Sequence, residues 1–214
     1  MKLPYDPLEA IQILSNADDQ MGALIHALGP YDIEYRPTLD PFETLCQAIV
    51  HQQLSGKAAG TIYRRFIDLL APSECPLPHE VLLLSPDDMR SAGLSGAKTA
   101  AILDLAQKTV SGLVPDGETL SNLSDEEIVE RLTSVRGIGP WTVEMLLIFR
   151  LGRPDVLPST DLGIRKGFAR VYGLEQLPTP SELIDYGDLW RPYRSVASWY
   201  LWRALEMEGE VLLP

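Results

Sequence analysis

The sequence predicts an all-α protein, and three observations support this. Apolar residues recur at helical spacing along most of the chain, as at Ala101, Ile102, Leu105 and Ala106. Ser or Asp, often followed by Pro, stands where these segments begin, and these residue types start helices. The Val- and Thr-rich alternation typical of strands is missing. At 214 residues the chain can bury a core as one compact unit or as two packed lobes.

Most expected helices begin at a capping residue. Two short amphipathic helices are expected over 7–15 and 18–28, and a short one over 86–91, capped by Ser85. Further helices are expected after the capping residues Asp40, Ser55, Ser95 and Ser124, and from about Thr160, Pro180 and Pro192. Ser124 and Glu127 have the spacing of a capping box, which predicts a helix over 125–134.

Charge and cysteine content narrow the functional class. The net charge of −12 argues against a nonspecific nucleic-acid coat, because binding to phosphates needs Lys and Arg. Residues 131–170 nevertheless carry a local charge of +4, which leaves −16 for the rest and is compatible with a DNA footprint on one face. A mixed, solvated surface is the alternative. No apolar run has the length of a membrane span, and the two cysteines cannot form a four-thiolate cluster. We expect a reduced, intracellular protein without a membrane segment.

The most informative segment is the stretch Gly137-Ile138-Gly139-Pro140 after the predicted helix over 125–134. Glycines permit positive φ, so Gly137 and Gly139 predict a tight hairpin, and Pro140 suits the first position of the next helix. Free amides at such a hairpin would bind a phosphate oxygen without a charged side chain. A lone Gly-x-Gly is more often an ordinary corner between two helices. The residues that flank it decide between the two interpretations.

The hairpin, the following Trp141-Thr142 and the run 156–161 resemble the helix-hairpin-helix (HhH-GPD) DNA glycosylase superfamily. The similarity is greatest to its alkylpurine, or DNA-3-methyladenine glycosylase II, branch, in the compact form without an N-terminal β-domain. Matching segments extend over roughly 35–207. The resemblance implies one domain of two closely packed helical lobes, about 40–160 and 1–39 with 161–214, with the active-site cleft between them. It also implies base flipping and hydrolysis of the N-glycosidic bond of alkylated purines (3-methyladenine, 7-methylguanine type) in duplex DNA.

Asp161 matches the catalytic aspartate of this superfamily. A fixed carboxylate stabilises the positive charge that develops on the deoxyribose when the N-glycosidic bond breaks. On its own, an Asp in the first turn of a helix more often only offsets the helix dipole. Members that also cut the DNA backbone carry a lysine nucleophile at the position of Trp141. The resemblance therefore implies a monofunctional enzyme, with no cofactor requirement and no iron–sulfur cluster.

Other residues take their expected roles from the same resemblance. Four match positions that line the base pocket, where an indole face would attract a cationic alkylated base: Trp141, Met145, Leu162 and Trp202. Core packing at helical spacing is the alternative for the last three. Residues expected to contact DNA are Gln53, Ser55, Gly137, Gly139, Thr142, Arg165 and Lys166, with Lys98 as a weaker phosphate contact. Gln53 matches the side chain that fills the gap left by the flipped nucleotide. For Gln52 and His51, a role in tying helices together is favoured.

The family hairpin also holds a monovalent cation, Na⁺ or K⁺, through backbone carbonyls that match Thr133, Val135 and Gly137. We expect the partner to be duplex DNA with alkylated bases, the protein to be a monomer, and its location to be the cytoplasm and nucleoid, or the nucleus in a eukaryote. Two other functions stay open. One is a glycosylase of the same fold for deaminated or mismatched bases, and the other is a non-catalytic module that binds damaged DNA. A helical scaffold unrelated to DNA is the remotest alternative.

Overall fold

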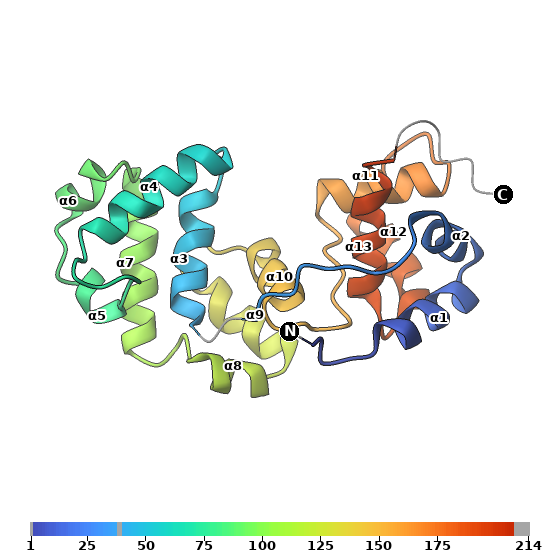
Figure 1. The fold of residues 1–214 in the computed structure, drawn as a ribbon, viewed down its shortest axis with the longest axis horizontal. Coiled ribbons are helices and arrows are strands. Elements are labelled where there is room, and N and C mark those ends of the chain that lie inside the picture. The colour runs from blue at the N-terminus through green and yellow to red at the C-terminus, as the bar shows by residue number, and fades with distance from the viewer. Residues whose placement is uncertain (1, 38–39, 208–214) are drawn as a thin grey trace. The chain divides into compact units, whose positions relative to one another are not determined.

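The computed structural model describes residues 2–37 and 40–207, and these residues form helices joined by turns and loops, without a β-strand. The all-α prediction is confirmed (Figure 1). The helices, in chain order, are α1 (Pro7–Ala17), α2 (Asp19–Leu28), α3 (Pro41–His51), α4 (Gly56–Asp68), α5 (Pro78–Val81), α6 (Pro86–Ser91), α7 (Gly96–Val110), α8 (Gly117–Asn122), α9 (Asp125–Thr133), α10 (Pro140–Phe149), α11 (Leu162–Val171), α12 (Pro180–Gly187), the 3-10 helix η1 (Asp188–Trp190) and α13 (Arg194–Ala204). No helix among the described residues is long and apolar enough to span a membrane.

The predicted caps are confirmed because they depend only on neighbouring residues. The side chains of Asp40, Ser55, Ser85 and Ser95 each accept a hydrogen bond from an amide in the first turn of their helix. The short elements α5, α8 and η1 were not predicted. Each spans six residues or fewer, which is too short to show a helical period.

The chain forms two compact units, each with its own core. The central unit comprises residues 38–143, and the terminal unit comprises residues 1–37 and 144–214. Residues 144–160, which the sequence assigned to the same lobe as the hairpin, cluster with the terminal unit. The central unit is built around α3 and α7, which pack side by side and are joined by α4, α5 and α6 (Figure 1). Leu45 and Ile49 of α3 and Ile102 and Leu105 of α7 are completely buried.

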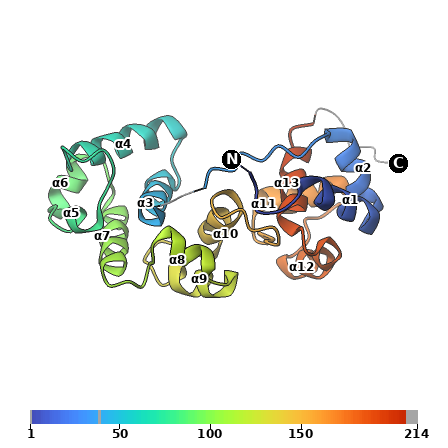
Figure 2. The same ribbon diagram turned by 60° about the horizontal axis from the view of Figure 1, so that its bottom comes forward.

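In the terminal unit, α11 and α13 lie side by side, and α13 also packs on α2 and α1 (Figure 2). Gly167 permits this close approach, because a Cβ at this position would stand 2.1 Å from the backbone oxygen of Leu201. A buried carboxylate ties three parts of the unit together. Asp18 accepts hydrogen bonds from the amide of Met21 (3.1 Å), the indole of Trp190 (2.9 Å) and the hydroxyl of Tyr172 (2.6 Å).

We predict that Gly167→Ala lowers stability by about 1–3 kcal/mol, because the added methyl group forces α11 away from α13. Gly60→Ala in α4 is the matched control. A Cβ at Gly60 meets nothing within 4 Å, so this variant is expected to gain about 0.5–1 kcal/mol from helix propensity. Thermal or urea unfolding measures both changes. Equal stability of the two variants would contradict the role given to Gly167.

Candidate functional site

The hairpin between α9 and α10 has the predicted frame. The capping box is complete, since the amide of Glu127 donates to Ser124 Oγ (3.2 Å) and the amide of Ser124 donates to Glu127 Oε2 (2.8 Å). Gly137 has a φ of +77° and lies in a turn that the amide of Ile138 closes on the carbonyl of Val135 (3.1 Å). The helix over 125–134, the tight hairpin and the start of α10 at Pro140 are therefore confirmed.

Two details of the hairpin differ from the prediction. Gly139 does not adopt positive φ, because the turn needs only one left-handed residue, at Gly137. The hairpin amides are also not all free, because the amide of Arg136 donates to Asp104 Oδ2 (2.8 Å). The amides of Gly137 and Gly139 have no acceptor within residues 2–37 and 40–207. A Cβ at Gly139 would meet nothing within 4 Å, so the backbone at this residue is open on the side of a Cβ.

The same aspartate links the hairpin to α7. Asp104 also accepts from Lys108 Nζ (2.8 Å), and Lys108 Nζ donates to the carbonyl of Ser134 (2.5 Å). These bonds lower the pKa of Asp104, although burial acts in the opposite direction and is the largest single influence on it. The charged form of Asp104 therefore holds one side of the hairpin, at Arg136.

Asp161 stands at the start of α11 and caps it. Its Oδ1 accepts hydrogen bonds from the amide of Ile164 (2.8 Å) and from the indole Nε1 of Trp202 on α13 (2.9 Å). The ring of Trp202 stacks on Phe149, with centroids 5.8 Å apart and planes at 30°. These two hydrogen bonds fix the position of the carboxylate at the N-terminus of α11. The structure thus brings together Asp161 and Trp202, two of the predicted site residues, within the terminal unit.

Gly163 is a site residue that the sequence analysis missed. A Cβ at this position would lie 2.9 Å from Asp161 Oδ1 and 2.9 Å from Trp202 Cδ1. Only glycine therefore leaves room for the indole to reach the carboxylate. The pattern Asp161-Leu162-Gly163 offered a signal, because a glycine in the first turn of a helix lowers helix propensity and calls for a packing reason.

Glu144 on α10 is the second missed residue. Its Oε2 is buried and has no hydrogen-bond partner in the part of the chain that the structure describes. Burial, and then the negative charge of Asp161, raise the pKa of Glu144 to about 7. At neutral pH, Glu144 is therefore present in comparable amounts as the carboxylic acid and as the carboxylate. A lone acidic residue in the otherwise apolar stretch 143–149 was the available signal.

The remaining pocket residues are placed in their own units. Leu162 is 52% exposed and Met145 is half-buried, both in the terminal unit. Trp141 belongs to the central unit and is 47% exposed. Phe149, stacked on Trp202, is an aromatic neighbour that the resemblance did not provide.

The residues expected to contact DNA differ in their solvent exposure and in the hydrogen bonds that they already make within the protein. Gln53, Ser55 and Lys166 are exposed. Thr142 is buried and its amide donates to the carbonyl of Gly139 (3.0 Å), which leaves little of it for contact with DNA. Arg165 is half-buried and its Nε donates to the carbonyl of Pro178 (2.8 Å).

Lys98 departs most from its expected role as a phosphate contact. Its ammonium group donates to the carbonyls of Val50 (2.7 Å) and Gln52 (2.9 Å), and burial lowers the pKa of Lys98. Gln52 itself donates from Nε2 to the carbonyl of Gly137 (2.8 Å), as expected for a residue that ties segments together. His51 bonds within its own helix, where Nδ1 lies 2.8 Å from the carbonyl of Gln47.

The carbonyls proposed to hold a cation partly fit that role. The Val135 carbonyl accepts from Ile138, and the Gly137 carbonyl accepts from Gln52. Each carbonyl oxygen has two lone pairs, so one remains at each for a cation. The cation site stays a prediction.

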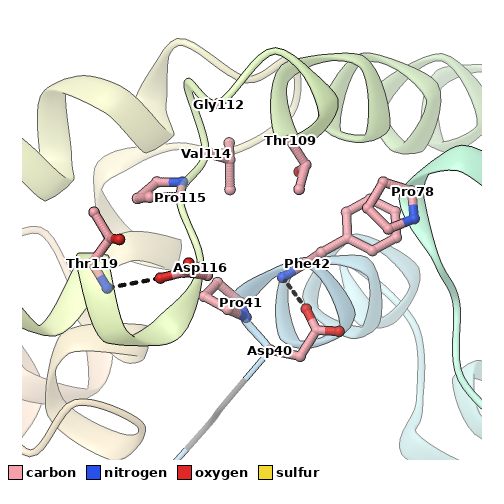
Figure 3. A pocket seen from close by; sticks show the side chains of 10 residues that line it. All are labelled: Asp40, Pro41, Phe42, Pro78, Thr109, Gly112, Val114, Pro115, Asp116 and Thr119. Atoms are coloured by element: carbon pink, nitrogen blue, oxygen red, sulfur yellow. Dashed lines mark hydrogen bonds between the residues drawn. The ribbon is translucent and has the colours of Figure 1, made fainter.

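A cavity of about 600 Å³ lies elsewhere in the central unit and contains none of the predicted site residues (Figure 3). Two capping aspartates line it. Asp40 accepts from the amide of Phe42 and Asp116 accepts from the amide of Thr119. Both carboxylates are thus occupied as helix caps, Asp40 at the start of α3 and Asp116 at the start of α8.

Comparison with known proteins identifies the superfamily to which the chain belongs. The family described as HhH-GPD superfamily base excision DNA repair protein matches residues 46–192. The chain belongs to this superfamily. It is 38% identical to DNA-3-methyladenine glycosylase 1 of Schizosaccharomyces pombe over 91% of this chain and 86% of that protein. The predicted superfamily and its alkylpurine branch are confirmed.

Two solved structures share the fold over nearly the whole chain. The S. pombe 3-methyladenine DNA glycosylase Mag1, solved in complex with abasic DNA, has a TM-score of 0.79 and covers 94% of this chain and 98% of its own. DNA-3-methyladenine glycosidase from Bacillus halodurans has a TM-score of 0.84 at 33% identity and covers 95% of this chain and 91% of its own.

We predict that Glu144→Gln raises stability more at pH 8 than at pH 5. The pKa of Glu144 is about 7 in the folded protein against an ordinary value of 4.5, so the folded state binds more protons between these values. The stability linked to this proton is present below pH 4.5 and is lost as the pH rises through 7. Thermal midpoints of the wild type and of Glu144→Gln at both pH values measure the effect. Glu175→Gln, at an exposed carboxyl of the same unit, is the control and should show no such difference.

Proposed function

We propose that this protein is a monofunctional glycosylase that hydrolyses the N-glycosidic bond of alkylated purines, of the 3-methyladenine and 7-methylguanine type, in duplex DNA. The observation that carries the proposal is the Asp161 carboxylate, fixed by the amide of Ile164 and by the indole of Trp202 beside the stacked ring of Phe149. The names of the relatives from S. pombe and B. halodurans support the same activity.

The chemistry requires little beyond a fixed negative charge. A purine methylated at N3 or N7 is cationic, so the C1′–N bond breaks with its electron pair going to the base, which leaves neutral. Positive charge develops on the deoxyribose, and Asp161 stabilises it without reorganisation because two donors hold the carboxylate in place. Water then adds at C1′ and loses one proton, which leaves an abasic site. Asp161 can also orient this water.

Recognition of the base is assigned to aromatic side chains. The face of an indole attracts a cationic base more strongly than a neutral one. In the terminal unit, Trp202, whose N–H is committed to Asp161, is the proposed contact, and Met145 and Leu162 are proposed apolar contacts. The exposed Trp141 of the central unit is proposed separately as a contact of the base. Trp141 has no amine to attack the sugar, and this supports hydrolysis without backbone cleavage.

DNA binding is assigned to the hairpin. The unpartnered amides of Gly137 and Gly139 and the open space over Gly139 suit a phosphate oxygen. A Na⁺ or K⁺ ion on the carbonyls of the hairpin would add positive charge at the same phosphate. Lys166 is a further phosphate contact. We propose a monomer that acts where the chromosome lies, in the cytoplasm and nucleoid of a bacterium or in the nucleus of a eukaryote.

The two alternatives differ from the proposal in their need for Asp161 and for cationic bases. A module that only binds damaged DNA does not need a carboxylate held by an indole. A glycosylase for deaminated or mismatched bases would need the carboxylate and would act on neutral bases.

We predict that Asp161→Asn lowers base release by on the order of 10²-fold or more, because it removes the charge that stabilises the transition state. The amide can keep the bonds to Ile164 and Trp202 through its oxygen, so fold and DNA affinity should be preserved. Single-turnover release of 3-methyladenine from duplex DNA measures the effect, with DNA affinity and the thermal midpoint as controls. Near-normal release by this variant would disprove the role of Asp161.

We predict that Gly139→Val weakens binding to any duplex and leaves stability nearly unchanged. Gly139 does not use positive φ and has open space around it, so the side chain fits the fold but covers the amide proposed to bind phosphate. Affinity for lesion-containing and undamaged duplexes should fall by the same factor, because phosphate contacts do not read the base. A loss confined to the lesion duplex would assign the hairpin to base recognition instead.

A further inference from the structure

The turn that follows α3 is held in a strained conformation. The amide of Leu54 closes the turn on the carbonyl of His51 (3.2 Å), with Gln52 at φ −51° and ψ 128° and Gln53 at φ +58°. Within the described residues, Gln53 is the only residue other than glycine with positive φ. This turn type normally places glycine or asparagine there, and another residue costs of order 1 kcal/mol or more. The surrounding structure must therefore stabilise the turn.

Lys98 supplies two of the bonds that do so. Its ammonium group reaches from the first turn of α7 to the carbonyls of Val50 and Gln52, at 2.7 and 2.9 Å. These carbonyls stand at the C-terminal end of α3, where a positive charge is favourable. Lys98 is half-buried, and this burial lowers the pKa of its ammonium group.

Gln52 makes a third hydrogen bond, which joins the turn to the hairpin. Its backbone carbonyl accepts from Lys98, while its side-chain Nε2 donates to the carbonyl of Gly137 (2.8 Å), 85 residues further along the chain. Gly137 is the left-handed residue of the hairpin, and its amide is one of the two proposed to bind phosphate. The strained turn and the hairpin are thus joined within the central unit through one side chain.

We propose that Lys98 and Gln52 form a clamp that fixes the exposed Gln53 side chain relative to the phosphate-binding hairpin, and that Lys98 is a positioning residue for nucleotide flipping rather than a phosphate contact. The proposal rests on the assigned DNA repair function. It deepens that function by naming what holds the inserted side chain in place. A side chain can remain inserted in the base stack only if its own backbone is held in place. The clamp holds the backbone at Gln53 by bonding the preceding residue, Gln52, to the hairpin that is proposed to bind the DNA phosphates.

A purely structural role for the same bonds is disfavoured by the identity of residue 53. Glycine would adopt this φ without strain, and the clamp would then have less to hold. The chain instead keeps an exposed glutamine there, whose side chain makes no hydrogen bond that the structure describes. We therefore attribute the strained backbone at residue 53 to a function of the glutamine side chain, and the clamp stabilises the strained conformation.

The test uses the full-length protein and a duplex that carries a tetrahydrofuran abasic analogue next to 2-aminopurine. Insertion of Gln53 should unstack 2-aminopurine and raise its fluorescence, and this readout needs binding but no catalysis. Lys98→Met and Gln53→Ala should each reduce the fluorescence gain at saturating protein. Each should also slow single-turnover excision of paired 7-methylguanine by about 3- to 30-fold, a fraction of the cost of unstacking. The double variant should be no slower than the slower single variant, because both changes remove the same event.

Two further variants keep the result interpretable. Arg90→Met removes one exposed positive charge from the same unit and should change neither readout, so it controls for charge. Gln52→Leu breaks only the bond to Gly137 and should reproduce part of the Lys98→Met defect; it replaces that variant if Lys98→Met fails to fold. Independent, additive effects of Lys98→Met and Gln53→Ala would overturn the clamp, as would a Lys98→Met defect equal on paired and unpaired lesions. Normal fluorescence gain with no base release would instead overturn the assigned activity and leave the clamp intact.

Discussion

The candidate active site depends on a single carboxylate that is also a structural group. Asp161 caps α11 and receives the indole N–H of Trp202, so the charge required by the chemistry is held by bonds that the fold needs in any case. This arrangement requires α13 to approach α11 closely, and two glycines on α11 permit it. Gly163 leaves room for the indole and Gly167 leaves room for the backbone of Leu201. A fixed carboxylate stabilises a developing cation without the cost of reorganising solvent.

Two of the acidic side chains near the candidate site and the hairpin have surroundings that reduce or pair their negative charge. Glu144 lies close enough to Asp161 to be affected by its charge, and the pair avoids two negative charges in partly buried surroundings by keeping Glu144 largely protonated below pH 7. In the central unit, the charge of Asp104 is paired with Lys108, and the carboxylate also accepts a hydrogen bond from the amide of Arg136. Along the sequence, residues 131–170 carry a local charge of +4 in a protein with a net charge of −12. Phosphate contacts are then made by backbone amides, which need no net charge.

The central unit uses the same turn geometry twice. The hairpin and the turn after α3 each place one left-handed residue before the amide that closes the turn, at Gly137 and at Gln53. Glycine adopts this conformation freely, while glutamine does not, so only the second turn needs support from outside. Lys98 and Gln52 supply it, and they connect the two turns. The two elements proposed to grip and to enter the DNA thus share one frame.

The sequence by itself determined everything that depends on near neighbours. The caps at Asp40 and Ser95, the capping box at Ser124 and the turn at Gly137 follow from residues within four positions of each other. The resemblance carried by the hairpin and by Asp161 determined the superfamily. The single left-handed glycine of the hairpin, against the two expected, lay beyond pattern reading, because turn type depends on which amide closes the turn.

Only the tertiary structure decided what each polar side chain does. Lys98 was expected to contact phosphate, and it bonds to carbonyls 46 and 48 residues away. The amide of Arg136 was expected to be free, and a carboxylate 32 residues away occupies it. The pKa of Glu144 depends on burial and on the charge of Asp161, and the sequence of its own helix determines neither of them. Hydrogen bonds and pKa values follow distances in space, and over such separations the chain order does not encode them.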